Sequence, residues 1–312
     1  MPSRHSNPTR PALPRTYSFP ETDASKAEEW AQPMWEYVRA NVGFEVSIGA
    51  LREDALPAVL HERFVNYVYS RLIVAGCFAF RKHEEEGLRD DDIERLEEAL
   101  NAAVEMVVDV PEEVRGRIVY YLVRLCPRIM GKRAEPNATQ RKQITRAAAK
   151  AGHRCYLCGR ELHFPKVRPY GKDNDPHIDR IREKRTFTIE HLWSKARGGS
   201  RDRNNLGACC AECNNLKKHL ISFADFALEQ IITAASEDSS VLTEVSSVPR
   251  LALLLRQGGS CAMCETKLHD MDNETLLLAR REIDQPYFFF NMMIVCTTCN
   301  DRHALKGVTL RA

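Results

Sequence analysis

Residues 187–220 read FTIEHLWSKARGGSRDRNNLGACCAECNNLKKHL, a stretch that concentrates reactive side-chain types. A carboxylate stands beside an imidazole at Glu190 and His191, and two thiols follow at Cys210 and Cys213. A neutral imidazole can accept a proton from water near neutral pH, and a carboxylate can bind a hard divalent cation. Those two groups together serve metal-dependent hydrolysis, whereas a thiol pair is typical of a zinc knuckle.

Paired cysteines recur along the chain. Eight of the eleven cysteines form Cys-x-x-Cys pairs, namely Cys155, Cys158, Cys210, Cys213, Cys261, Cys264, Cys296 and Cys299. In a reducing compartment such pairs indicate zinc ligands rather than disulfides, unpaired structural thiols or a redox dithiol. Four thiolates close a tetrahedral site, so we expect two structural zinc ions, one in each of two units. Cys77, Cys126 and Cys209 are left over as expected buried or bystander thiols.

The two units are an internal duplication. LLLRQGGSCAMCETKL resembles RAAAKAGHRCYLCGREL, and NMMIVCTTCNDRHALK resembles NLGACCAECNNLKKHL. Asn205 precedes Cys210 by five positions, as Asn291 precedes Cys296. Repetition of this kind is a stronger indication of a shared fold than any single knuckle.

The second unit lacks the reactive pair of the first. Fourteen positions before Asn205 lies His191, whereas fourteen positions before Asn291 lies Leu277. Residues 264–291 contain no Glu-His or Asp-His pair. We therefore predict a zinc-stabilised second unit that has no catalytic base.

The order Cys-x-x-Cys, Glu-His, Gly-Gly, Asn, Cys-x-x-Cys-Asn and Lys over about residues 145–220 resembles the HNH endonuclease superfamily. The catalytic core of that superfamily is a ββα-metal unit. The resemblance implies that His191 is the general base that takes a proton from the attacking water. It also implies that Glu190 and Asn214 hold one divalent ion against the scissile phosphate, and that Asn205 braces the loop that aims the base. Many members have histidine at the position of Asn214 and aspartate at that of Glu190.

The resemblance implies a second kind of metal besides zinc. Carboxylate and amide oxygens favour Mg²⁺ or Mn²⁺ over zinc, so we expect one catalytic ion of that type. Such an ion can neutralise the charge that develops on phosphorus during hydrolysis. The zinc ions would hold the fold, and the second metal would take part in the reaction.

Basic residues gather around this stretch. Residues 141–220 contain 19 Lys and Arg against 8 Asp and Glu, a net charge of +11, whereas residues 21–140 have a net charge of −8. A basic block of this size indicates a polyanion partner, which we expect to be DNA, with RNA as the alternative. The candidate phosphate contacts are Lys217, Lys218, Arg197, Arg201 and Arg203. Each of these could instead be a solvated charge, and we expect Trp193 to be a packing residue.

The elements around the reactive stretch predict an α+β protein that is mostly helical. Ile93, Leu96, Leu100 and Val104 fall near helical spacing in the N-terminal part. We predict a disordered leader at 1–20, a helical domain at 21–140, an HNH nuclease domain at 141–222, a helix and linker at 223–247, and a degenerate, treble-clef-like zinc unit at 248–312.

The composition also bears on location and partners. No segment approaches the roughly 18 to 20 apolar residues of a membrane helix, so we expect a cytoplasmic protein without membrane contact. The acidic helical domain is a candidate surface for a regulatory protein partner.

Two classes of function fit the sequence. The first is a metal-dependent endonuclease that hydrolyses phosphodiester bonds, and the second is a non-catalytic zinc-knuckle adaptor that binds nucleic acid or protein. The joint presence of Glu190, His191 and Asn214 favours the nuclease, because an adaptor needs none of them in register. By family analogy alone, the nuclease would be a bacterial defence effector that works with a partner.

Overall fold

The computed structural model of the 312-residue chain describes eight ranges of residues. They are residues 30–42, 55–85, 93–131, 136–164, 176–226, 247–271, 276–283 and 287–309. The expected leader at residues 1–20 and most of the expected linker at 223–247 lie outside the described residues. The predictions of a disordered leader and of a helix and linker therefore stay predictions.

The described part of the N-terminal region consists of helices. They are α1 (Ala31–Asn41), α2 (Ala55–Glu85), α3 (Ile93–Glu105) and α4 (Glu112–Met130). Pro111 precedes α4, where its missing N–H costs no helical hydrogen bond, and two glutamates in the first turn favour the positive end of the helix dipole. Apolar side chains from all four helices pack into one buried core, as the helical spacing predicts.

The first unit contains the opening stretch of sequence. Its elements are α5 (Ala138–Lys150), α6 (Pro176–Arg185), β1 (Phe187–His191), the short helices η2 (Lys195–Arg197) and η3 (Arg203–Asn205), β2 (Leu206–Cys210) and α7 (Ala211–Lys217). Asn137 begins α5 with a capping box in which it exchanges hydrogen bonds with Gln140. Strands β1 and β2 pair antiparallel, and every residue of β2 is buried.

The second unit repeats this order. Its elements are α8 (Ser247–Arg256), η5 (Leu268–Asp270), β3 (Leu276–Arg280), β4 (Met292–Cys296), α9 (Thr297–His303) and β5 (Val308–Thr309). Strand β3 lies between β4 and β5 in an antiparallel sheet. Both units thus run from a helix through a cysteine knuckle and two paired strands into a short helix.

Backbone hydrogen bonds confirm the internal duplication. Tyr156 N donates to Ala208 O at 3.0 Å, and at the equivalent positions Ala262 N donates to Ile294 O at 3.0 Å. These bonds attach each knuckle to the second strand of its own unit. The likeness between the two segments is therefore one of structure as well as of cysteine spacing.

The strand register corrects one pairing between the units. In the first unit Cys210 pairs with Phe187, the first residue of β1. In the second unit Cys296 pairs with Leu276, the first residue of β3. Counting along the strands from there makes Ala279 the counterpart of Glu190 and Arg280 the counterpart of His191. The prediction that Leu277 corresponds to His191 is wrong, because the loop between β3 and β4 is three residues shorter than the loop between β1 and β2.

The second unit packs against the first mainly through α8. Arg250 on α8 forms an ion pair with Glu212 on α7 at 2.8 Å. Near the first knuckle, a Cβ on Gly159 would lie 2.7 Å from the carbonyl oxygen of Leu268, so the two backbones touch at a position with φ of 70°. Glycine is needed there, because it tolerates both the close approach and the positive φ.

The loop that follows β1 is buried in the core of the N-terminal helices. Trp193 is 2% exposed and packs edge-on against Trp35 and Tyr69, with ring centroids 6.3 and 5.9 Å apart. Its indole N–H and the Tyr69 hydroxyl both donate to the carbonyl oxygen of Arg197, at 2.7 and 2.8 Å. The expectation that Trp193 is a packing residue is confirmed, and the first unit shares a core with the helices at this loop.

Gly198→Ala is expected to destabilise the protein by about 1–3 kcal/mol. Gly198 has a φ of 90°, and a Cβ there would lie 2.5 Å from Cδ1 of Leu125 and 3.0 Å from Cβ of Ala31. Gly116→Ala is the matched control, because nothing lies within 4 Å of a Cβ at this position inside α4. That change should stabilise the protein by roughly 0.5–1 kcal/mol. Urea unfolding measures the stability of both variants. Equal midpoints for Gly198→Ala and Gly116→Ala would contradict the packing of the loop after β1 against the N-terminal helices.

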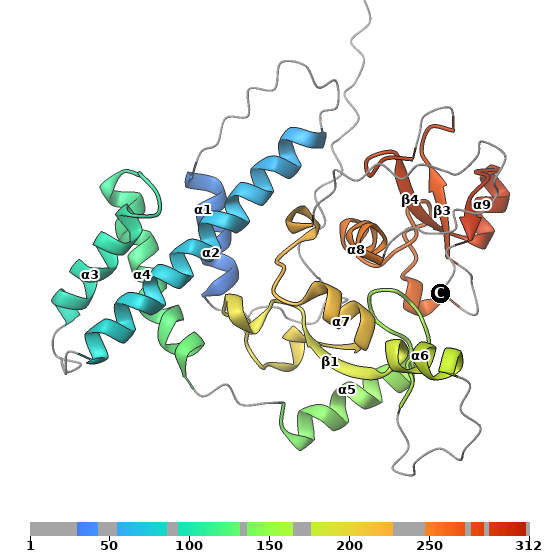
Figure 1. Ribbon diagram of the computed structural model, residues 1–312, viewed down its shortest axis with the longest axis horizontal. Coiled ribbons are helices and arrows are strands. Elements are labelled where there is room, and N and C mark those ends of the chain that lie inside the picture. Colours follow the sequence, from blue (N-terminus) through green and yellow to red (C-terminus); the bar gives the residue numbers. More distant parts are fainter. Residues whose placement is uncertain are drawn as a thin grey trace, which may run out of the picture.

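The architecture confirms the predicted fold class. The described residues are mostly helical and include two small antiparallel sheets, so the protein is α+β. Figure 1 shows helices α1 to α4 on one side, the first unit in the middle and the second unit on the other side. None of the helices in the described ranges combines the length and apolarity that a bilayer span requires.

Candidate active site

Four sulfur atoms converge in each unit. Within each group the Sγ atoms lie within 4.8 Å of one another; the groups are Cys155, Cys158, Cys210 and Cys213, and Cys261, Cys264, Cys296 and Cys299. The Sγ atoms of Cys158 and Cys210 are 3.8 Å apart. Zn–S bonds of about 2.3 Å at tetrahedral angles give nearly the same separation. Each group could therefore hold one zinc ion.

The thiol pKa values differ within these groups. Burial raises the pKa of Cys155 well above its ordinary value. Hydrogen bonds from Cys155 and the other neighbouring thiols lower the pKa of Cys210. At exposed Cys264, a hydrogen bond from Thr266 lowers the pKa to about 7. A cation at the centre of each group would favour the thiolate forms, as zinc does.

The three remaining cysteines are not members of either group. Cys126 and Cys209 are buried and Cys77 is half-buried, as expected for structural thiols. The Sγ atom of Cys209 lies 3.8 Å from that of Cys155. By strand register its counterpart in the second unit is Val295, so this fifth thiol is not common to both units.

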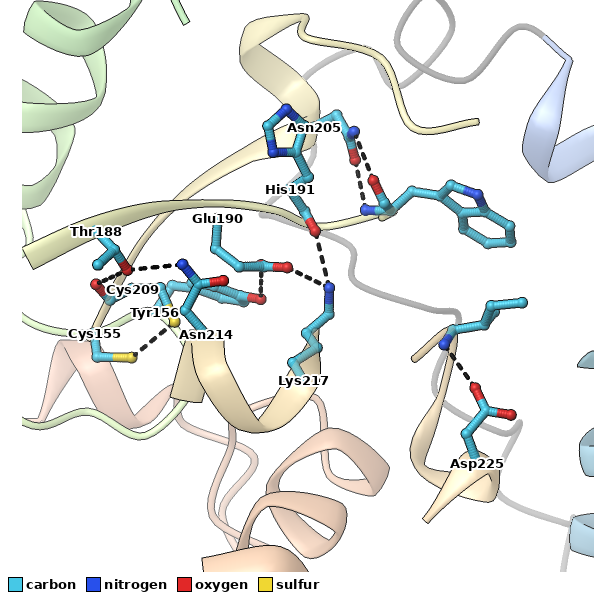
Figure 2. Close-up of polar contacts among 12 residues, drawn as sticks. Cys155, Tyr156, Thr188, Glu190, His191, Asn205, Cys209, Asn214, Lys217 and Asp225 are labelled. Carbon is cyan, nitrogen blue, oxygen red and sulfur yellow. Dashed lines mark hydrogen bonds and ion pairs between the residues drawn. The ribbon is translucent and has the colours of Figure 1, made fainter. Parts of the chain in front are cut away.

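Glu190 is buried between the first knuckle and α7. Its side chain is 4% exposed, and its Oε2 accepts a hydrogen bond from the hydroxyl of Tyr156 at 2.7 Å. Its Oε1 forms an ion pair with Nζ of Lys217, which also donates to the carbonyl oxygen of His191 at 2.9 Å. Figure 2 shows the carboxylate between these two partners.

Lys217 lies inside the protein. Its side chain is 1% exposed, because it comes one helical turn after Asn214 and so lies on the face of α7 that covers β1. An ammonium group that is buried and paired with Glu190 is not placed to contact a phosphate. The predicted phosphate contact of Lys217 is therefore corrected to an internal ion pair.

Asn214 lies beside Glu190 on the side of β1 that faces α7 (Figure 2). The hydroxyl of Thr188 donates to the carbonyl oxygen of Cys209 at 3.0 Å, so its oxygen is left to accept a bond from Asn214 at 3.2 Å. The donor must be the amide nitrogen of Asn214, which fixes the orientation of the amide group. Its oxygen therefore points away from Thr188, where it can bind a cation.

His191 ends β1 and projects in a different direction. Side chains alternate along a strand, and Figure 2 shows the imidazole on the opposite side of the ribbon from Glu190 and Asn214. His191 is half-buried, and its Nε2 atom is buried. The structure thus brings Glu190 and Asn214 together and places the imidazole apart from them, at the end of the strand.

Asn205 organises the loop between β1 and β2. It is fully buried, accepts a hydrogen bond from the backbone N–H of Trp193 at 2.6 Å, and donates to the carbonyl oxygens of Trp193 and Ser200 at 3.0 and 2.7 Å. Gly199 is needed beside it, because a Cβ there would lie 1.8 Å from the Trp193 carbonyl oxygen. The loop that leaves His191 is therefore fixed at several backbone atoms.

A comparison with known families matches residues 179–224 to HNH endonuclease. The chain contains an HNH domain. The match runs from within α6 to just beyond α7, and so confirms the resemblance over the stretch that holds Glu190, His191, Asn205 and Asn214. No curated protein and no solved structure matches the chain.

The other predicted phosphate contacts of the HNH domain have different exposures. Arg201, Arg203 and Lys218 are exposed, and Arg197 is half-buried. Arg201 and Arg203 lie in the loop between β1 and β2, and Lys218 directly follows α7. They remain candidates for contacts with nucleic acid, and Arg197 also serves the fold through its backbone carbonyl.

The side chains near Asn214 fit a hard divalent cation. Glu190 offers a carboxylate and Asn214 an amide oxygen on the same side of β1, and oxygen donors of this kind suit Mg²⁺ or Mn²⁺. Each Glu190 oxygen already has one protein partner, but a carboxylate oxygen has two lone pairs. A cation can therefore share this carboxylate with Tyr156 and Lys217.

Sequence reasoning missed Tyr156 and Thr188 and assigned Lys217 to the wrong partner. Thr188 stands two residues before Glu190, so strand alternation could have placed both on one face. No local pattern connects Tyr156 with Glu190, because they are 34 positions apart. Aligning the two units on Cys155 and Cys261 would have paired Tyr156 with Ala262 and so shown that this position differs between them.

Proposed function

We propose that this chain is a metal-dependent endonuclease that hydrolyses phosphodiester bonds, with DNA as its most suitable substrate. The observation that carries the proposal is the oriented amide of Asn214 beside the buried carboxylate of Glu190, within the stretch that matches HNH endonuclease. An adaptor has no use for an amide oxygen held beside a carboxylate. The basic charge of residues 141–220 supports a polyanionic substrate.

Each residue of the proposed site has a separate task. Glu190 and Asn214 hold the divalent ion, which when bound neutralises charge on the scissile phosphate. His191 accepts the proton of the attacking water from the end of β1. Asn205 holds the loop that follows His191 through hydrogen bonds to the backbone N–H and carbonyl of Trp193. These bonds restrict the position of His191.

The test is cleavage of plasmid, linear duplex and single-stranded DNA, and of RNA, by purified protein with Mg²⁺, Mn²⁺ or chelator. Wild-type protein should cut with either metal and not with chelator. Asn214→Ala should lower the cleavage rate by more than about 100-fold, because losing a metal ligand should cost more than the 10- to 100-fold loss that is typical when a residue behind a ligand is removed. Its metal-activation curve should also shift to higher Mn²⁺ concentration.

Asn300→Ala is the matched control in the second unit. Asn300 corresponds to Asn214, but its amide oxygen accepts a hydrogen bond from Gly307 N at 2.8 Å and so serves the backbone. This variant should cut at the wild-type rate. Nucleic acid binding without cleavage under all metal conditions would support the adaptor instead, and equal losses in both variants would contradict the assignment of one working site.

A further inference from the structure

Three polar side chains meet at the proposed active site, where Glu190 and Lys217 are buried and Tyr156 is half-buried. The hydroxyl of Tyr156 donates to Oε2 of Glu190 at 2.7 Å, and Nζ of Lys217 forms an ion pair with Oε1. The three residues come from the first knuckle, from β1 and from α7 (Figure 2). We call them the Tyr156–Glu190–Lys217 cluster.

Stability alone does not account for this cluster. Both charged side chains are almost completely buried, at 1% exposure for Lys217 and 4% for Glu190. Removing two charges from water is costly, and replacing a buried ion pair with apolar residues of similar volume is often neutral or stabilising.

The second unit provides an internal comparison. It has the same knuckle, paired strands and short helix, and its four sulfur atoms converge in the same way. It nevertheless has none of the three side chains of the cluster. The positions equivalent to Tyr156, Glu190 and Lys217 hold Ala262, Ala279 and His303. The shared fold therefore forms without the cluster, which occurs in the unit that has His191.

The equivalent asparagines of the two units, Asn214 and Asn300, also differ in their hydrogen bonds. Asn214 is oriented by Thr188, so that its amide oxygen points away from that hydroxyl. The counterpart of Thr188 in the second unit is Leu277, which cannot orient an amide. Asn300 there uses its amide oxygen on the backbone N–H of Gly307. The polar arrangement around Glu190 is thus specific to the first unit.

We propose that Tyr156 and Lys217 are positioning residues of the HNH site, which hold the Glu190 carboxylate in place for the divalent ion. The inference rests on the proposed function, because it assigns Glu190 as a metal ligand. Lys217 binds both the carboxylate and the carbonyl oxygen of His191. It therefore fixes the metal ligand relative to the residue that carries the proposed base. Tyr156 follows Cys155 directly, so the first sulfur group fixes the other side of the carboxylate.

A positioning role for Lys217 and a purely electrostatic effect of its charge predict opposite changes in metal affinity when the ammonium group is removed. Loss of the Lys217 ammonium removes a positive charge beside the proposed ligand, so Coulomb repulsion alone predicts tighter binding of a divalent ion. Loss of a positioning residue predicts weaker binding, because the carboxylate is no longer held. The direction of the change therefore decides between the two.

The experiment measures Mn²⁺ binding to the full-length protein without DNA, from the electron paramagnetic resonance signal of free Mn²⁺. Tyr156→Phe removes one hydroxyl and keeps the ring, and Lys217→Met removes the charge at similar length. Both should raise the Kd for Mn²⁺ about 10- to 100-fold and lower kcat with little change in KM for DNA. The zinc content should stay at the wild-type value.

Two variants serve as matched controls. Tyr67→Phe removes a hydroxyl from a tyrosine that is 63% exposed on α2, and His303→Met changes the exposed counterpart of Lys217 in the second unit. Both should bind Mn²⁺ and cut DNA as wild type does.

The outcomes separate this inference from the proposed function. Tyr156→Phe with wild-type Mn²⁺ affinity and kcat would overturn the positioning role, and so would tighter Mn²⁺ binding by Lys217→Met. Tyr156→Phe keeps the test valid if Lys217→Met fails to fold. A wild-type protein that binds no Mn²⁺ and cuts no substrate would overturn the proposed function itself.

Discussion

His191→Ala is expected to lower the rate of DNA cleavage about 10²- to 10⁴-fold, the usual contribution of a general base. The substitution removes the proposed proton acceptor and touches neither group of four cysteines. Zinc content and unfolding midpoint should therefore stay close to the wild-type values. Single-turnover cleavage rates at saturating Mg²⁺ measure the loss, and raised pH should restore part of it because hydroxide can replace the base.

His219→Ala is the control for this prediction. His219 is an exposed histidine just beyond α7, outside the proposed machinery, and its loss should leave the cleavage rate unchanged. Cleavage by His191→Ala within about tenfold of wild type would remove His191 from the role of general base. The proton acceptor would then have to be sought on the side of β1 that carries Glu190.

Cys210→Ser is expected to remove one of two zinc ions per chain and to abolish cleavage. Structural zinc in small domains contributes on the order of 10 kcal/mol or more to folding, and the first unit has only a two-stranded sheet and short helices around its sulfur group. Cys210 also ends β2 and directly precedes α7, the helix that carries Asn214. Loss of this ligand should therefore disorder the proposed metal site.

Cys296→Ser makes the equivalent change in the second unit. It should also leave one zinc ion per chain, and it should destabilise the region after α8 more than the first unit. Cys77→Ser, which changes a thiol outside both groups, should keep two zinc ions. Elemental analysis of purified protein gives the count, and close to one zinc per chain in the wild type would contradict the assignment of two sites.

Local spacing along the chain was enough to identify several groups of residues. The four cysteine pairs, the internal duplication and the mostly helical α+β class were predicted, because knuckles and apolar periodicity are local patterns. The HNH stretch was recognised for the same reason, since Glu190, His191, Asn205 and Asn214 lie within 25 positions of one another.

The partner of each of these side chains depends on contacts between segments that are distant in the sequence. Lys217 and Lys218 are neighbours in sequence, but the turn of α7 buries the first against Glu190 and exposes the second. Tyr156 reaches the same carboxylate because the sulfur group and the backbone hydrogen bond from Tyr156 to Ala208 hold the first knuckle beside the paired strands. Trp193 is held by helices far away in the chain.

The counterpart of His191 was likewise set by strand register and not by counting from an asparagine. Arg280 takes that place because the second loop is three residues shorter, a change that hydrogen-bonded strands do not absorb but loops do. Spacing along the chain therefore determined which groups this protein contains. Pairing between strands and packing between helices decided which of those groups meet, because contacts between distant segments depend on the whole fold.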